Sequence, residues 1–314
     1  MASAIDKISF FLDDQPVEAQ AGETLWQVAK RYQQTIPHLC YSESPDYVPS
    51  GNCRACMVEI EGERVLAPSC VRTPTEGMRV YSATSERAQT ARKAVMELLL
   101  SDQAPRPEAH DKNSAMWQWA EQLGVEASRY PAKPGVAADD SHTAIAVNMD
   151  ACITCQLCVQ ACRDIQVNDV IGLSNRGSHT QIVFDFNDPM GESTCVSCGE
   201  CVQACPTGAL LPQTMVDEAG IGVFDKGEQP DRQVDSICPY CGVGCQIRYH
   251  IKNDKILYVD GQPGASNKNR LCVKGRFGYD YVDHPDRLST PLIRKAGVPK
   301  VVDDTFDVLV HGDR

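Results

Sequence analysis

The stretches CITCQLCVQAC, residues 152–162, and CVSCGECVQAC, residues 195–205, decide how this chain is organised. Each has the spacing C-x2-C-x2-C-x3-C, and both end on the same Val-Gln-Ala-Cys tetrapeptide. A tandem repeat of this kind predicts a pseudo-symmetric module made of two similar halves. Runs of four thiolates at this spacing are typical of iron–sulfur ligand sets, so the module is expected to hold two clusters.

The remaining cysteines form two more groups of four, one on each side of the repeat. In chain order the quartets are Cys40, Cys53, Cys56 and Cys70; Cys152, Cys155, Cys158 and Cys162; Cys195, Cys198, Cys201 and Cys205; and Cys238, Cys241, Cys245 and Cys272. They account for all 16 cysteines. Because four thiolates can hold one cluster, the sequence predicts four clusters and an electron-carrying protein.

Disulfide and zinc chemistry are the alternative uses of these cysteines. A disulfide-rich secreted scaffold is disfavoured, because cysteines two residues apart on a tight loop seldom meet disulfide geometry. A zinc ribbon needs only two CxxC pairs, so the third and fourth cysteines of each run would have no use. Iron–sulfur binding is the interpretation that uses every cysteine.

Composition excludes some classes of partner and compartment. The 314 residues carry a formal net charge of −12 and only 6% aromatic residues, so a nucleic-acid partner is not expected. Met1–Phe11 lacks a basic stretch followed by an apolar run, the chain has no twin-arginine pair, and no apolar segment approaches bilayer-spanning length. The sequence therefore predicts a cytoplasmic protein without a membrane partner, in a compartment where thiols stay reduced.

The pattern of elements predicts an α+β multi-domain chain. The expected parts are a [2Fe–2S] ferredoxin-like domain at 1–83, a helical linker region at 84–141, a two-cluster module at 142–215, a linker at 216–232, a small β-rich domain at 233–290 and a tail at 291–314. Two strands followed by a helix resemble the start of a β-grasp fold.

Local patterns predict the elements inside these parts. The N-terminal part is expected to have a hairpin of 7–12 with 16–19, a helix capped by Thr24, a hairpin of 57–60 with 64–66 and a strand at 78–81. A helix is expected at 85–100, and its apolar face consists of Ala88, Ala91, Val95, Leu98 and Leu99. A short helix around 117–123 and a hairpin of 246–250 with 255–259 complete the set.

The repeat resembles the bacterial two-cluster ferredoxins, whose pattern is CxxCxxCxxxCP. In that family the fourth cysteine of each run ligates the cluster of the other run. The resemblance implies one [4Fe–4S] cluster on Cys152, Cys155, Cys158 and Cys205, and another on Cys162, Cys195, Cys198 and Cys201. Pro206 matches the family proline, whereas Arg163 replaces it in the first run; this removes no ligand.

The outer quartets resemble two further families. GNCRAC, residues 51–56, is similar to the [2Fe–2S] domain of the large iron–sulfur subunit of respiratory complex I and its relatives. CPYCGVGC, residues 238–245, with CVKGR, residues 272–276, resembles the [4Fe–4S] domain of molybdopterin-dependent oxidoreductases. That second resemblance implies that Lys274 lies between the cluster and the pterin and assists electron transfer.

Taken in order, these parts resemble the alpha subunit of cytosolic NAD-dependent formate dehydrogenases. The resemblance implies one [2Fe–2S] and three [4Fe–4S] clusters, a molybdenum or tungsten bis(pterin guanine dinucleotide) centre on a longer chain, and a flavin- and NAD-binding iron–sulfur beta subunit carrying FMN. Electrons from formate would then pass from the Cys238 site through the module to or alongside the [2Fe–2S] site. No catalytic residue is expected within these 314 residues, and the tail from Ser289 is expected to lead into a pterin-binding region.

Other interpretations remain open. A stand-alone multi-cluster ferredoxin or adaptor subunit would use the same cysteines, whereas complex I and hydrogenase fit less well. Molybdenum against tungsten, cluster potentials, the electron acceptor and the oligomeric state are not decided by sequence. The histidines are expected to be ordinary solvated residues; they are His38, His110, His142, His179, His250, His284 and His311.

Overall fold

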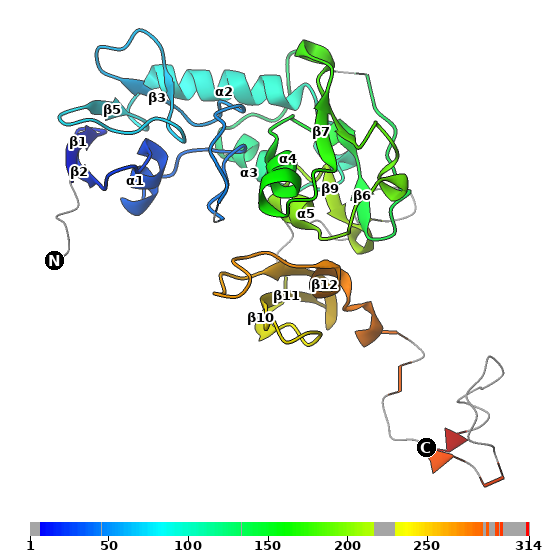
Figure 1. Ribbon diagram of the computed structural model, residues 1–314. Helices are drawn as coiled ribbons and strands as arrows, with labels where there is room; N and C mark the ends of the chain where they lie inside the picture. The colour runs from blue at the N-terminus through cyan, green and yellow to red at the C-terminus, as the bar shows by residue number, and fades with distance from the viewer. Residues whose placement is uncertain are drawn as a thin grey trace, which may run out of the picture. The chain divides into compact units, whose positions relative to one another are not determined.

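The computed structural model describes residues 7–44, 46–132, 134–216, 230–284, 287–288, 293–294, 296–297 and 312–313. It divides into two units, Met1–Phe277 and Gly278–Arg314. All four cysteine quartets lie in the first unit, whose helices and strands are drawn in Figure 1 with labels where there is room. Within these ranges, none of the helices has both the length and the apolar character required to span a bilayer.

A five-stranded mixed sheet with one helix forms the N-terminal part of the first unit. Its strands are β1 (Ile8–Leu12), β2 (Gln15–Ala19), β3 (Met57–Ile60), β4 (Ala67–Pro68) and β5 (Arg79–Tyr81). The order is β2-β1-β5-β3-β4, and β1 pairs with β5 in parallel while the other pairs are antiparallel. Helix α1 (Leu25–Arg31) begins at a capping box formed by Thr24 and Gln27, and its apolar side shares one core with the sheet.

The expected strand at 64–66 is wrong. Residues 61–66 form an extended turn, in which Gly62 has a φ of +79° and Val65 is exposed. The strand that pairs with β3 begins only at Ala67, so the connection is longer than the sequence pattern predicted.

The long helix α2 (Glu86–Leu100) is present, but its buried face differs from the predicted one. Ala88, Arg92, Met96 and Leu100 are buried, whereas Leu98 is exposed. Arg92 replaces an apolar residue on this face because its guanidinium donates to the carbonyl of Met57 (2.8 Å) and to the Ser82 hydroxyl (2.8 Å). A charged residue that is fully hydrogen-bonded can occupy a core position, which the apolar pattern alone does not reveal.

Asp13, in the turn between β1 and β2, ties the sheet to the start of α2. Its carboxylate accepts hydrogen bonds from the backbone N–H groups of Ser82 (2.8 Å), Ala83 (3.1 Å) and Thr84 (3.1 Å), and from the Thr84 hydroxyl (2.6 Å). Burial raises the pKa of Asp13, but these hydrogen bonds outweigh it and hold the pKa below its usual range. The carboxylate therefore stabilises the fold in its charged form.

Asp13→Ala is expected to destabilise the N-terminal sheet by about 2 kcal/mol, because several hydrogen bonds to one charged group are lost. Backbone hydrogen exchange in β5 measures this. Asp14→Ala is the matched control, since Asp14 also has a positive φ but makes only an exposed ion pair with Arg79. The control is expected to cost about 1 kcal/mol or less from the lost ion pair. Equal effects of the two substitutions would contradict the role given to Asp13.

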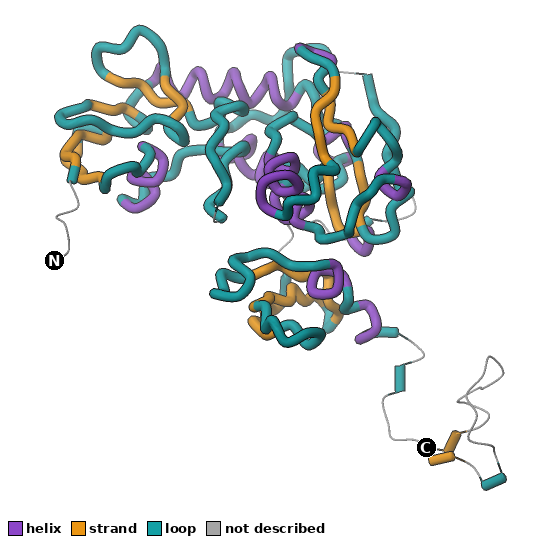
Figure 2. Tube along the Cα trace, viewed as in Figure 1, coloured by secondary structure: helices purple, strands orange, loops and turns teal. Residues whose placement is uncertain are grey.

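The central part of the unit contains a short helix and the repeat module. Helix α3 (Ala115–Gln122) precedes two small antiparallel sheets, which pair β6 (Ile145–Val147) with β9 (Leu210–Pro212) and β7 (Ile171–Ser174) with β8 (Gln181–Phe184). The two cysteine runs supply α4 (Leu157–Gln160), which continues as a π-helical turn over Ala161–Ile165, and α5 (Glu200–Ala204). Figure 2 shows how much of the chain around these helices is loop.

The last part of the first unit is a three-stranded antiparallel sheet with a short helix. The strands β10 (Arg232–Ile237), β11 (Gln246–Lys252) and β12 (Lys255–Gly261) follow one another in the sheet, and α6 (Val273–Phe277) comes after them. The β11–β12 hairpin turns at Asn253 and Asp254, both with positive φ, as the sequence predicted. Most of the expected linker at 216–232, namely 217–229, lies outside the described residues.

Among its described residues, the second unit has a turn of 3-10 helix at Asp280–Val282 and a short pairing of β13 (Ile293–Arg294) with β14 (Gly312–Asp313). Most of the expected tail at 291–314, including His311, lies outside the described residues.

Candidate iron–sulfur centres

The first quartet is enclosed by the N-terminal sheet and its loops. Cys40, Cys53, Cys56 and Cys70 are each 5% exposed or less. The backbone N–H of Cys53 donates to Sγ of Cys40 (3.3 Å). Hydrogen bonds from the thiols of Cys53 and Cys70 hold the pKa of Cys40 well below its usual range. The group is therefore a compact, buried set of four sulfur donors in which one thiolate is already favoured.

The two runs of the repeat build two separate sites. One small cavity has Cys152, Cys155, Cys158 and Cys205 in its wall, and a second has Cys162, Cys195, Cys198 and Cys201. The fourth cysteine of each run thus lies at the site of the other run. This exchange follows from the antiparallel pairing of β6 with β9, which brings the two ends of the module together.

Burial sets the electrostatics of these sites. It raises the pKa of Cys155, Cys158 and Cys201 well above the usual value of a thiol. Desolvation disfavours a buried thiolate, so these positions need a cationic partner to become ligands. Backbone N–H groups supply further stabilisation, since Thr154 donates to Sγ of Cys152 (3.3 Å) and Ser197 to Sγ of Cys195 (3.4 Å).

The loops that carry the cysteines are held in an unusual backbone conformation, at matching positions of the two runs. Thr154 and Ser197 have φ values of +51° and +55°, and Gln156 and Gly199 have values of +68° and +70°. A β-branched residue such as Thr154 rarely enters this region, and each such residue costs about 1–2 kcal/mol. The backbone is bent so that N–H groups face the sulfur atoms, which is how protein tunes a cluster.

The last quartet is the most accessible of the four. Cys238 is buried, Cys245 is half-buried, and Cys241 and Cys272 are exposed. The backbone N–H of Cys238 donates to the carbonyl of Cys245 (2.8 Å), which closes the loop between β10 and β11. Burial and the neighbouring Cys238, Cys241 and Cys272 raise the pKa of Cys245, so all four thiols lie within electrostatic reach. Lys274, predicted to assist electron transfer, is exposed on α6.

Two of the donor sets line cavities that fit iron–sulfur clusters. Among the described residues, no three His, Cys, Asp or Glu side chains converge closely enough to hold one ion. A cavity walled by four cysteines, with N–H groups facing their sulfur atoms, suits a cluster whose own iron and sulfide fill the centre. All sixteen cysteines fall inside the described ranges, and no disulfide joins any of them.

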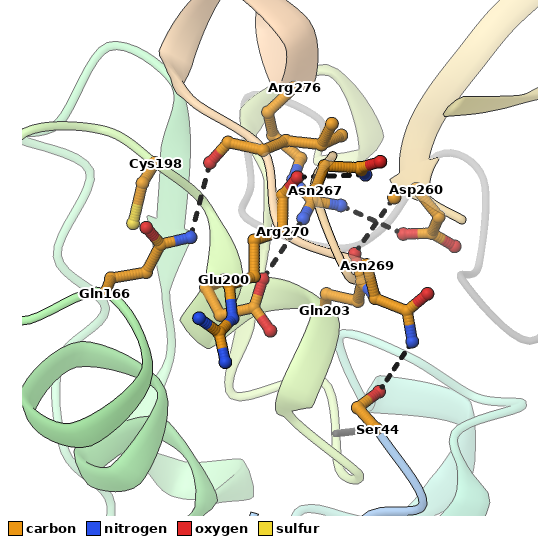
Figure 3. Close-up of polar contacts among 12 residues, drawn as sticks. Ser44, Gln166, Cys198, Glu200, Gln203, Asp260, Asn267, Asn269, Arg270 and Arg276 are labelled. Atoms are coloured by element: carbon orange, nitrogen blue, oxygen red, sulfur yellow. Dashed lines mark hydrogen bonds and ion pairs between the residues drawn. The ribbon is translucent and has the colours of Figure 1, made fainter. Parts of the chain in front are cut away.

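The structure also shows a buried charged network that sequence reasoning missed. Arg276, four residues after Cys272, and Glu200, next to Cys201, are each 2% exposed, and Nη2 of Arg276 lies 3.6 Å from Oε2 of Glu200. Arg276 also donates to the carbonyl of Val259 (2.8 Å) and to the Asp260 carboxylate (3.1 Å). Figure 3 shows Glu200, Asp260 and Arg276 among the surrounding polar contacts.

A loop of the N-terminal part approaches the same place. The Tyr47 hydroxyl donates to Oε1 of Glu200 (3.1 Å), and the amide of Asn269 donates to the Ser44 hydroxyl (3.4 Å). Arg270 makes an ion pair with Asp46. Burial raises the pKa of Glu200 even though Arg276 and Tyr47 act to lower it. The residues that meet at Glu200 are separated by more than 70 positions, so no local sequence signal could have found this network.

The prediction that the histidines are solvated is wrong for His110, His142 and His250, which are buried. The Nδ1 atom of His142 accepts the N–H groups of Ala144 and Ile145 (3.1 Å each), so the ring proton is on Nε2, which lies 3.0 Å from the Ser197 hydroxyl. Burial lowers the pKa of His142. A neutral histidine therefore supports the loop of the second run, and its role is structural.

The sites follow one another through direct packing. Cys40 and Cys53 of the first quartet share an apolar cluster with Cys155 and Leu157 of the first run. Helices α4 and α5 of the two runs are in contact. Arg276 then joins the second run to the last quartet. The order of contact is therefore first quartet, Cys205-containing site, Cys162-containing site, last quartet.

Three family models match the chain in the same order as the sites. Residues 6–85 match a 2Fe-2S iron-sulfur cluster binding domain, residues 151–209 a 4Fe-4S dicluster domain, and residues 231–284 a molybdopterin oxidoreductase Fe4S4 domain. Each match contains one or two of the quartets described above.

Similar proteins are oxidoreductases or subunits of them. The chain is 29% identical over 332 residues to "Putative formate dehydrogenase YrhE" of Bacillus subtilis (strain 168), covering 93% of this chain and 33% of that protein. It is 31% identical over 297 residues to a subunit of the NADH-quinone oxidoreductase of Rhizobium meliloti (strain 1021), covering 92% of this chain and 33% of that protein. The chain thus spans about a third of the length of these relatives.

A solved structure shares the fold. A chain of the NAD+-reducing [NiFe]-hydrogenase in the H2-reduced state aligns with a TM-score of 0.60 and 24% identity, covering 71% of this chain and 95% of that chain. At this identity the likeness concerns the fold alone.

Proposed function

We propose that this chain is the electron relay of an NAD-dependent formate dehydrogenase alpha subunit. Its similarity to proteins named as formate dehydrogenases and as a subunit of NADH-quinone oxidoreductase supports the proposal. The observation that carries the proposal is the unbroken contact order of four four-cysteine sites. A carrier that acts by relay needs its sites adjacent, whereas independent structural metal sites do not.

The sixteen cysteines would bind four clusters, one at each site. Cys40, Cys53, Cys56 and Cys70 would hold a [2Fe–2S] cluster, and the other three groups, with the fourth cysteines of the two runs exchanged, would each hold a [4Fe–4S] cluster. Such clusters, when bound, supply one-electron transfer. The protein contributes burial, N–H groups that face sulfur atoms and direct packing between neighbouring sites.

The two ends of the relay would face different partners. Next to the last quartet, Lys274 would mediate transfer from a molybdenum or tungsten bis(pterin guanine dinucleotide) centre held by a longer chain. At the other end, the [2Fe–2S] site would deliver electrons to a beta subunit that binds flavin and NAD. The reduced thiols that cluster assembly requires are typical of the cytoplasm, where we place the protein.

Iron analysis tests the proposal. The purified chain, reconstituted anaerobically, is expected to contain about fourteen iron atoms, with matching acid-labile sulfide, from one [2Fe–2S] and three [4Fe–4S] clusters. EPR of the reduced protein is expected to show both cluster types. The chain by itself is expected to oxidise no formate. Zinc in place of iron, or formate turnover by these 314 residues, would overturn the proposal.

A stand-alone multi-cluster ferredoxin or adaptor is the second candidate. The exposure of Cys241 and Cys272 favours it, because a surface cluster can exchange electrons with a separate protein. Relatives three times as long favour the first candidate. The natural reading frame decides between them, since a frame that continues past Arg314 into pterin-domain sequence supports the alpha subunit.

A further inference from the structure

The strongest unexplained feature outside the cysteines is the close packing of α6 on the loop of the second run. Gly199 lies in this loop between Cys198 and Glu200, and it has no side chain that would keep α6 and the loop apart. A Cβ placed on Gly199 would lie 2.7 Å from Cγ of Arg276 and 2.9 Å from Cζ of Phe277. The first atom lies near the start of its side chain and the second belongs to a rigid ring, so the two segments could not stay in place.

The first run provides an internal comparison. Gln156 occupies the position that Gly199 has in the second run, and its φ of +68° is nearly the same as the +70° of Gly199. The loop conformation alone therefore does not require glycine. What requires glycine in the second run is the approach of Arg276 and Phe277.

The neighbouring positions differ in the same sense. Leu157 follows Gln156 and packs in the apolar cluster with Cys40 and Cys53 of the first quartet. Glu200 follows Gly199 and lies instead against Arg276. The two equivalent positions of the repeat thus face opposite neighbours, one through an apolar contact and the other through a buried ion pair.

We propose that Gly199, Glu200 and Arg276 are positioning residues that fix the cluster loop of the second run at the distance from the last quartet that electron transfer requires. Both partners of the ion pair are directly attached to ligand segments, since Glu200 adjoins Cys201 and the N–H of Arg276 donates to the carbonyl of Cys272 (3.0 Å). A rigid link between these residues is therefore a rigid link between the two sites. The inference rests on the proposed relay function and names the residues that set one of its steps.

Two further hydrogen bonds join the two-cluster module to the segment from the end of β12 to α6; this contact region is called the junction. The Gln203 side chain accepts the N–H of Gly261 (3.2 Å), and the Gln166 amide donates to the carbonyl of Leu271 (3.3 Å). Gln166 and Gln203 come from the two halves of the module, while Gly261 and Leu271 flank the segment that carries Asn267 and Arg270 (Figure 3). The junction is therefore held at several points around the ion pair.

The test compares Gly199→Gln with Gly177→Gln in the full chain with all clusters reconstituted. Glutamine is the residue that the first run carries at this position. Gly177 has a φ of +63° in the same module, and nothing lies within 4 Å of a Cβ built there, so it controls for backbone strain. The readout is the magnetic coupling between reduced clusters in EPR spectra, which falls with the cube of their separation.

We expect the coupling between the last cluster and its neighbour to be lost in Gly199→Gln, with iron and sulfide unchanged, and retained in Gly177→Gln. Glu200→Gln, which keeps the hydrogen-bonding shape but removes the charge, is expected to weaken it. Unchanged coupling in both Gly199→Gln and Glu200→Gln would overturn the proposal. Loss of iron in these variants would also overturn it, because the contact would then serve cluster assembly. Wild-type chain without iron would instead refute the relay function itself.

Discussion

Cys205→Ala is expected to empty the site of the first run, and Cys162→Ala the site of the second. Each substitution removes one wall of the cavity on the other side of the repeat, because Cys205 lines the site of Cys152, Cys155 and Cys158. Alanine cannot ligate iron, so each variant should contain about four fewer iron atoms per chain than the wild type.

Double substitutions make this prediction specific. Cys152→Ala combined with Cys205→Ala should still remove only about four iron atoms, because both residues serve one site. Cys195→Ala combined with Cys205→Ala should remove about eight, because two sites are damaged. Iron and acid-labile sulfide per chain, with EPR of the reduced protein, measure the difference. The reverse pattern would mean that each run keeps its own fourth cysteine.

Arg276→Met is expected to destabilise the contact between α6 and the module by about 3–5 kcal/mol, because it leaves the buried Glu200 carboxylate without its cation. A local loss of this size should speed amide hydrogen exchange in β12 and α6 by about a hundredfold or more. Mass spectrometry of exchanged peptides gives the rates segment by segment.

The matched comparison is the double variant Glu200→Met with Arg276→Met. Replacing both partners of a buried ion pair by apolar residues is often neutral, so exchange in the double variant should be slower than in Arg276→Met alone. It should stay above the wild-type rate, because the hydrogen bonds of Arg276 to Val259 and Asp260 are still lost. Glu200→Met is also measured alone. If the effect of the double variant equals the sum of the effects of Glu200→Met and Arg276→Met, the two residues do not act as a pair. A surface pair such as Arg163 with Asp164, both about half exposed, should give little effect when it is broken.

Sequence reasoning located features whose signal is local. The spacing within each quartet, the repeat, the hairpin turn at Asn253 and Asp254 and the cap at Thr24 are all set by residues a few positions apart. The exchange of Cys162 and Cys205 between the runs came only from family resemblance, and it stays a prediction until iron is measured. The cavities show why it is geometrically reasonable.

Features that depend on partners far away in the sequence were not predicted. Arg92 was missed on the buried face of α2 because its acceptors, Met57 and Ser82, belong to other elements. Glu200 and Arg276 look like ordinary charged residues until the fold brings them together. His142 was likewise predicted to be solvated, although it is buried and its Nε2 atom lies 3.0 Å from the Ser197 hydroxyl of the second run. In each case tertiary hydrogen bonds changed the environment that residue type alone would suggest.

The burial that keeps Cys155, Cys158 and Cys201 protonated has a consequence for how the protein matures. Ligands must be ionised before they bind iron, so filling these sites discharges acid into the solvent. Cluster insertion at these sites is therefore expected to be favoured at high pH and disfavoured at low pH. Before iron binds, the same protonated thiols are poor nucleophiles, so these three cysteines are expected to react slowly with oxidants.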